Sequence, residues 1–186
     1  MALTKVIGSG IGTVTNQFTD ANMSAGSVVQ VVQTTKTDTF TTTTTDYVDV
    51  TGLSVAITPT SSSNKILFIY NLSVGGANGA DVNHVIIQML RGSTRLNIGD
   101  ARGSNRFRGT NFVNTATAGQ MFQPSAMILD SPSSTSELTY KVQIGTTAGA
   151  HTACINRSGR DSDESAGYDG NASSTITVME IVGWQI

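Results

Sequence analysis

Most of the chain alternates short apolar runs with clusters of Gly, Pro, Asn and Ser. From Ser27 onward, β-branched and aromatic runs end about every 8–12 residues at such a cluster, a spacing typical of antiparallel strands. No window has a 3.6-residue apolar period, so we expect very little helix. The pattern predicts an all-β fold, an antiparallel jelly-roll sandwich. The expected strands cover residues 28–42, 46–51, 53–58, 65–74, 82–91, 94–98, 120–130, 137–146, 150–156 and 174–185.

The first 26 residues differ from the remainder of the chain. They contain the run Gly8-Ser-Gly10-Ile-Gly12 and only isolated apolar residues such as Phe18. This pattern predicts an extended N-terminal arm over residues 1–26 and one head domain over 27–186. The glycine run matches neither a dinucleotide-binding nor a P-loop spacing and precedes no predicted helix, so we interpret it as a turn.

Three predicted strands, at 65–72, 84–90 and 175–184, have apolar residues on both faces. Since a strand face in water should be polar, a second apolar face requires a cover. Another copy of the chain supplies that cover in a closed oligomer, and a loop folded over the outer face is the alternative. In the first strand Ile66, Phe68, Tyr70 and Leu72 face opposite to Leu67 and Ile69, and in the last Ile176, Val178, Val182 and Trp184 face opposite to Met179 and Ile181.

The amino-acid composition limits the kinds of molecule that this chain is expected to bind. The formal net charge is −2 and only 13% of residues are charged, which disfavours binding to nucleic acid or anionic lipid. Cys154 is the single cysteine, so no internal disulfide forms. No apolar run approaches 18 residues and the N-terminus does not resemble a signal peptide, so we expect no membrane insertion.

Catalytic and metal-binding motifs are poorly supported. His84 and His151 are the only histidines, and neither lies in a spacing that presents two ligands to one metal. The many Ser and Thr residues include no nucleophile-elbow sequence. We therefore expect no enzyme activity, no catalytic residues, no metal and no cofactor.

Two stretches carry most of the local charge. An arginine-rich stretch at 91–108 has a single acid, Asp100, and glycines that predict a long loop. Guanidinium groups there suit carboxylates or phosphates of a surface glycan, and the favoured alternative is pairing with an acidic loop of the same chain. The candidate glycan contacts are Arg95, Arg102, Arg106 and Arg108; the candidate acidic partners are Asp161, Asp163, Glu164 and Asp169.

The acidic loop also has the Asp-x-Asp spacing of a calcium site. The next ligand position of an EF-hand, residue 165, is Ser, and no Gly falls at the required place. We therefore do not interpret this loop as a calcium site.

Three separated segments resemble a family of tailed-bacteriophage virion proteins, the fibre and knob proteins common in marine and cyanobacterial phages. They are Ser27-Val-Val-Gln-Val-Val-Gln-Thr-Thr-Lys-Thr-Asp-Thr-Phe, Val50-Thr-Gly-Leu-Ser-Val-Ala-Ile-Thr-Pro-Thr-Ser-Ser-Ser-Asn-Lys-Ile-Leu, and Asn156-Arg-Ser-Gly with Ser174-Thr-Ile-Thr-Val-Met-Glu-Ile. The resemblance covers about residues 27–183. It implies a trimeric jelly-roll head similar to tumour-necrosis-factor-like and complement-type heads, with the C-terminal strand near the threefold axis. Only about 26 residues precede the head, which disfavours a long fibre.

From these features we expect a virion protein, made in the bacterial cytoplasm, that acts as a homotrimeric tail or neck fibre or knob and contributes to host-surface attachment. A capsid decoration protein without host binding is the alternative, and a glycan-processing enzyme is a weaker one because Asp161, Asp163 and Glu164 lie too close together for a catalytic pair. The trimer interface is assigned to Met179, Ile181 and Trp184. The arm, which we expect to bind other virion proteins, docks through Leu3, Val6, Ile7, Ile11 and Phe18.

Overall fold

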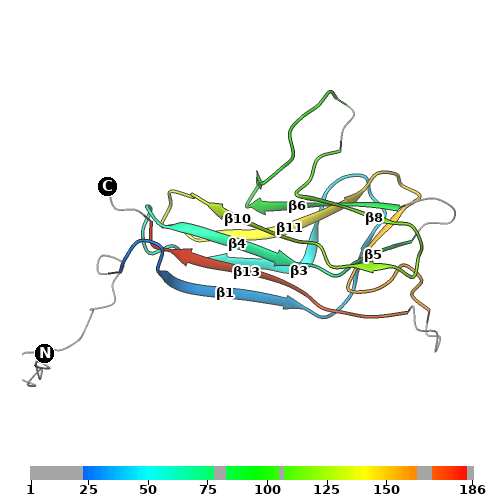
Figure 1. Ribbon diagram of the computed structural model, residues 1–186, viewed down its shortest axis with the longest axis horizontal. Helices are drawn as coiled ribbons and strands as arrows, with labels where there is room; N and C mark the ends of the chain where they lie inside the picture. The colour runs from blue at the N-terminus through cyan, green and yellow to red at the C-terminus, as the bar shows by residue number, and fades with distance from the viewer. Residues whose placement is uncertain (1–22, 78–82, 105–106, 163–168, 184–186) are drawn as a thin grey trace, which may run out of the picture.

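The computed structural model describes residues 23–77, 83–104, 107–162 and 169–183. Within these ranges every regular element is a strand, every strand pair is antiparallel, and no helix occurs (Figure 1). The all-β prediction is therefore confirmed. The strands are β1 (Val28–Lys36), β2 (Phe40–Thr42), β3 (Val48–Ile57), β4 (Lys65–Asn71), β5 (Val74–Ala77), β6 (Asn83–Arg91), β7 (Thr94–Leu96), β8 (Asn111–Thr115), β9 (Met121–Phe122), β10 (Ser125–Asp130), β11 (Leu138–Thr146), β12 (Thr152–Ile155) and β13 (Ser174–Ile181).

The strands form three sheets. The first has the order β1-β13-β4-β10, and the second has the order β3-β11-β6-β7 with β8 also paired to β6. These two sheets pack face to face as a β-sandwich, with β3 against β1 and β13. A third, shorter sheet, β2-β12-β5-β9, lies at the end of the sandwich opposite to the described chain ends (Figure 1).

The core lies between the two larger sheets and follows the period-two alternation of their strands. Ile66, Phe68 and Tyr70 of β4 are fully buried, as are Ile176 and Val178 of β13. The ring of Phe68 meets that of Tyr140 on β11 edge to face, with 5.3 Å between centroids, a favourable aromatic geometry. The sequence predicted two opposite apolar faces on each strand without choosing between them, and the structure turns these residues inward.

The predicted strand boundaries need three corrections. The expected strand at 28–42 is divided into β1 and β2, and those at 65–74 and 120–130 are divided likewise. Conversely, the expected break between 46–51 and 53–58 is absent, because Gly52 takes a positive φ of 83° inside the continuous strand β3. Strand β8 was not predicted, since its short Phe-Val pair stands between polar residues and shows no longer alternation.

The described chain begins beside the point where it ends. The Gly26 N–H donates to the Val182 carbonyl at 2.9 Å, and the Val182 N–H donates to the Ser27 carbonyl at 2.9 Å. Both described ends therefore leave the sandwich at one end (Figure 1). The arm residues Leu3, Val6, Ile7, Ile11 and Phe18 lie outside the described residues.

Candidate functional site

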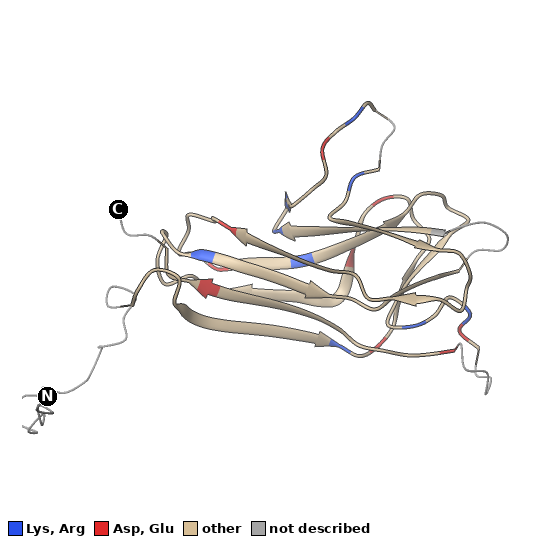
Figure 2. Cartoon of the chain, viewed as in Figure 1, with Lys and Arg blue, Asp and Glu red and all other residues tan. Residues whose placement is uncertain are grey.

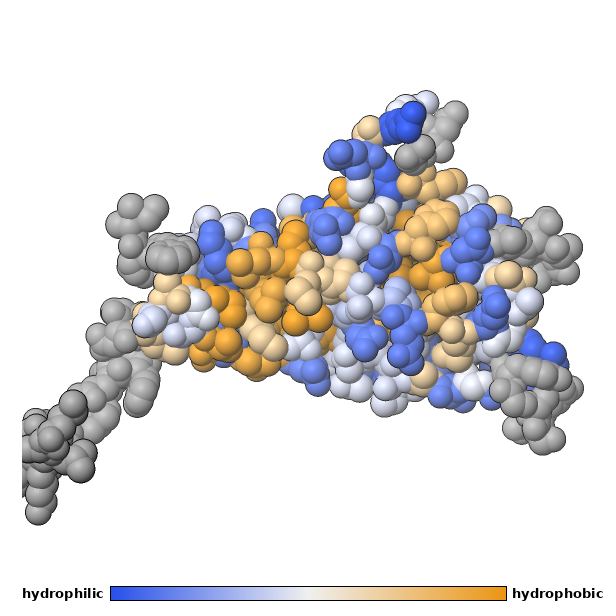
Figure 3. Space-filling model, in the orientation of Figure 1, coloured by the Kyte–Doolittle hydropathy of each residue, from blue (hydrophilic) through white to orange (hydrophobic). Residues whose placement is uncertain are grey.

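The outer surface of the first sheet is apolar over half of its length. Val31, Met179, Leu67 and Leu129 are register partners on four adjacent strands, so they form one continuous row. Ile69 and Met127 extend it on one side, and Ile181 and Val28 on the other. We call these eight residues the apolar face; it lies near the described chain ends (Figure 3).

Much of the apolar face is in contact with solvent. Met127 is 64% exposed, Leu129 55% and Val31 54%, although large apolar side chains normally leave water. Lys65, whose Nζ donates to Ser131, carries the only charge among the outward positions of these four strands as described. Met179 and Ile181, predicted for an interface, lie on this face half-buried. Trp184 lies outside the described residues.

The second apolar face of β6 has a different cover. Ile86 and Leu90 point away from the main core and are nevertheless buried. The segment at Arg108 and Gly109 lies over Ile86 and Gln88: a Cβ on Gly109 would stand 2.6 Å from Cγ2 of Ile86, and Gln88 Nε2 donates to the Arg108 carbonyl at 2.7 Å. For this strand the chain itself supplies the cover, which corrects the prediction that another copy is needed there.

This covering segment belongs to a loop at residues 97–109, which we call the arginine loop and which projects from the sandwich (Figure 1). Its base is closed by two bonds: the Gly99 N–H donates to the Gly109 carbonyl at 3.3 Å, and Arg108 Nε donates to the Gly99 carbonyl at 2.7 Å. The Arg108 carbonyl also accepts a bond from Tyr47 Oη at 2.9 Å. The loop base is thereby held on the second sheet.

The arginine loop and β8 enclose an open cavity of about 490 Å³. We call it the loop cavity. Two large aromatic side chains on its lining, Phe107 and Phe112, remain 44% and 53% exposed. The lining residues are Gly99, Asp100, Ala101, Arg102, Phe107, Arg108, Gly109, Thr110, Asn111 and Phe112.

The structure separates the arginines that the sequence grouped. Arg91 pairs with Asp130 at 2.6 Å, and the guanidinium of exposed Arg95 lies 5.5 Å from the ring centre of Tyr47, a cation–π distance. Arg102 and Arg108 line the loop cavity, whereas Arg106 lies outside the described residues. Of the four candidate glycan contacts, two are therefore brought together in one cavity.

The acidic loop, residues 161–169, pairs with arginines of its own region. Arg157 Nη1 lies 3.3 Å from Asp161, and Arg160 Nε lies 3.6 Å from Asp169. In Figure 2 the arginine loop projects from one side of the sandwich, whereas blue and red segments lie close together on the opposite side. The expected pairing between the two loops is thus wrong for Asp161 and Asp169, because nearer arginines neutralise them. Asp163 and Glu164 lie outside the described residues.

One buried carboxylate fixes the end of β13 to the sheet. Glu180 is fully buried and accepts hydrogen bonds from Gln30 Nε2 at 2.6 Å and from Asn64 Nδ2, Thr60 N and Thr60 Oγ1 at 2.7 Å each. Burial raises the pKa of Glu180, but the hydrogen bonds from Asn64, Gln30 and Thr60 together lower it below its ordinary value. The carboxylate is held ionised without a cation beside it.

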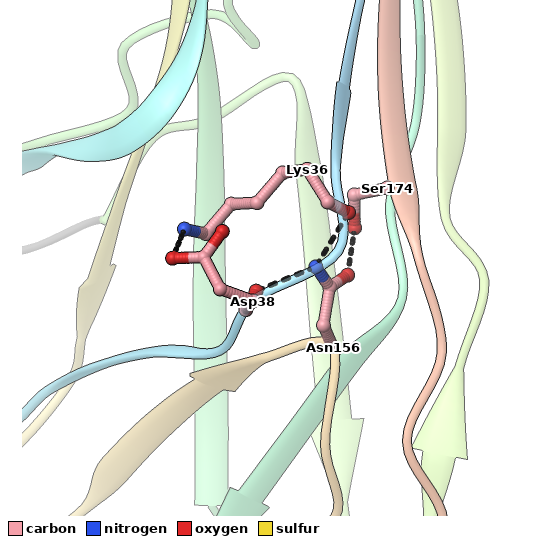
Figure 4. Close-up of polar contacts among 4 residues, drawn as sticks. All are labelled: Lys36, Asp38, Asn156 and Ser174. Atoms are coloured by element: carbon pink, nitrogen blue, oxygen red, sulfur yellow. Dashed lines mark hydrogen bonds and ion pairs between the residues drawn. The ribbon is translucent and has the colours of Figure 1, made fainter.

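A second polar cluster joins the first sheet to the third (Figure 4). Asn156 takes a positive φ of 66°, and its Nδ2 donates to the carbonyls of Lys36 and Asp38 at 2.8 and 2.9 Å. Its Oδ1 accepts a bond from Ser174 Oγ at 2.6 Å. The Lys36 ammonium, 2.7 Å from Asp38, lowers the pKa of that carboxyl. These side chains bond to one another and to the carbonyls of Lys36 and Asp38, so we assign the cluster to the fold.

The remaining chemistry-bearing side chains are dispersed. His84 packs its ring 5.1 Å from that of Phe112, and His151 lies half-buried. Burial raises the pKa of the Cys154 thiol. Across the described ranges, no three His, Cys, Asp or Glu side chains are grouped to hold a metal, and no helix could span a membrane.

Comparison with known proteins adds no assignment. No protein-family model matches the chain. No curated protein matches it either.

Proposed function

We propose that this chain is a homotrimeric virion structural protein of a tailed bacteriophage, a tail or neck fibre or knob. Its N-terminal arm binds other virion proteins, and its head contributes to attachment to the host surface. The observation that carries the proposal is the apolar face, whose Met127 and Leu129 have no cover within the described chain. Exposed apolar patches of this kind mark protein–protein contacts.

Two further features support a jelly-roll head of this kind. The sheet orders β1-β13-β4-β10 and β3-β11-β6-β8 each join strands from distant parts of the chain, as in a double-sheet jelly roll. The C-terminal strand β13 lies in the middle of the sheet that has the apolar face. Three copies packed through this face would place β13 near their common axis, in agreement with the sequence resemblance.

Light scattering on the purified protein tests the assembly. We expect a mass three times that of the chain, and Leu129→Asp should reduce it to one chain mass while circular dichroism still reports β structure. A buried unpaired carboxylate at each of three interfaces costs several kcal/mol. Ala56→Asp is the matched control, because Ala56 is exposed on the second sheet. A single-chain mass for the wild type, or an undisturbed Leu129→Asp assembly, contradicts the trimer.

The virion role needs a separate experiment. Antibodies against the head, used in electron microscopy of purified phage particles from the source of this chain, should label a fixed position on every particle. Labelling of the tail or neck supports the fibre or knob, and labelling of the capsid surface supports the decoration alternative. Purified particles without the protein contradict both.

A further inference from the structure

The loop cavity has a rigid base. Thr110 N–H donates to the Ile87 carbonyl at 2.7 Å, and Asn111 Nδ2 donates to Tyr70 Oη at 2.8 Å and to the Ser125 carbonyl at 3.0 Å. The carbonyl of Arg108 accepts bonds from both Gln88 and Tyr47. A ligand that enters the cavity therefore meets a surface that is already ordered, which lowers the entropic cost of binding.

The lining combines aromatic and cationic groups. Exposed Phe107 and Phe112 offer ring surface to a ligand, and exposed Arg102 offers a planar guanidinium. Arg108 is partly committed, since its Nε donates to the Gly99 carbonyl. Aromatic rings take apolar faces of a ligand, while a guanidinium takes a carboxylate with two parallel hydrogen bonds.

The charge of the lining limits the ligand to a low charge density. Arg102 and Arg108 stand against Asp100, so the described lining carries one net positive charge. Arg91 and Arg95 are held elsewhere, by Asp130 and over Tyr47. A polyphosphate chain would need many cations, whereas one carboxylate per ligand unit matches this lining.

We propose that the loop cavity binds an acidic saccharide that has a carboxylate on a pyranose ring. The C–H face of the sugar packs on Phe107 and Phe112, and its carboxylate pairs with Arg102. This inference deepens the host-attachment part of the proposed function and rests on it. It is tested on the purified protein, so its failure is distinct from failure of the trimer or of the virion location.

The probe is a glycan array that carries glucuronate, galacturonate and sialic acid oligosaccharides, their methyl-esterified neutral forms, and an acidic glutamate peptide. We expect binding to at least one acidic glycan, at least tenfold weaker binding to its neutral form, and no binding to the peptide. Arg102→Gln and Phe107→Ala should each weaken binding at least tenfold. Arg160→Gln, with the same charge change outside the cavity, should leave it unchanged.

Thermal melts of all three variants establish that they remain folded. Absence of binding to every acidic glycan overturns the proposal, and so does equal binding to the neutral forms. If Arg102→Gln and Arg160→Gln weaken glycan binding equally, the glycan is attracted by the overall charge of the protein and the cavity is not its site. Binding of the peptide as strongly as the best glycan would assign the cavity to an acidic protein segment.

Discussion

Replacing Glu180 by Gln should destabilise the head and change how its stability depends on pH. The carboxylate accepts four hydrogen bonds, three at Oε1 from Thr60 and Asn64 and one at Oε2 from Gln30. An amide at this position keeps one acceptor oxygen and places an NH₂ group against the Gln30 donor. That donor cannot turn away without cost, because it also bonds to the Thr58 carbonyl at 2.8 Å.

The size of the effect follows from the bonds that change. Hydrogen bonds to a charged group contribute about 1.5–3 kcal/mol each and neutral ones about 0.5–1.5 kcal/mol. Weakening the three bonds at Oε1 by about 1 kcal/mol each lowers the free energy of unfolding by about 3 kcal/mol, and the two facing donors at Oε2 add to this loss. In a domain of this size each kcal/mol lowers Tm by about 2–4 °C, so we expect a loss of at least about 6 °C at pH 7.

Acidification should reduce the difference between the two proteins. Because hydrogen bonds hold the pKa of folded Glu180 below its ordinary value, its contribution is complete above the unfolded pKa of about 4.3 and is lost as pH falls through the folded pKa. Thermal melts from pH 7 to pH 3 measure this, with exposed Glu137→Gln as the control. A loss below about 2 °C at pH 7, or a difference independent of pH, would refute the reasoning.

Two further changes test the packing. Gly159→Ala should lower the Tm by several degrees, because the new Cβ would stand 2.1 Å from the Gly76 carbonyl oxygen; Gly149→Ala, with no heavy atom within 4 Å, should be neutral, and equal melting temperatures would contradict the close approach. Buried Cys154, whose pKa is raised by burial, should react with a thiol reagent only as the protein unfolds, so rapid labelling of the native protein would show that the third sheet opens.

The apolar face was predictable from sequence because strand alternation encodes it directly. Leu67 and Met179 fall on the parity opposite to Phe68 and Val178, and no chain folding can bring both sets to one side of a strand. Met127 and Leu129 alternate in the same way with Ala126 and Ile128 on β10, but no second apolar face was predicted for that strand. The alignment of these residues into one row depends on register, which local alternation leaves open.

The loop cavity was only partly predictable. The arginine-rich stretch pointed to Arg102 and Arg108, yet Phe107 and Phe112 had no periodic context to mark them as exposed. The partners of these arginines could not be predicted from the local sequence, because Asp130, Tyr47 and the Gly99 carbonyl meet them only in the folded chain. A charge count locates a basic stretch, whereas the fold decides which of its side chains remain available.

Because the base of the arginine loop is closed by hydrogen bonds, changes in the loop tip should not disturb the strands of the sandwich. The bonds from the Gly99 N–H to the Gly109 carbonyl and from Arg108 Nε to the Gly99 carbonyl close the loop at its base, so the sandwich does not depend on the length of the chain between them. Doubling the length of such a loop costs only about 0.6 kcal/mol in closure entropy. The tip can therefore be lengthened or replaced, in evolution or by design, while the strands beneath keep their register.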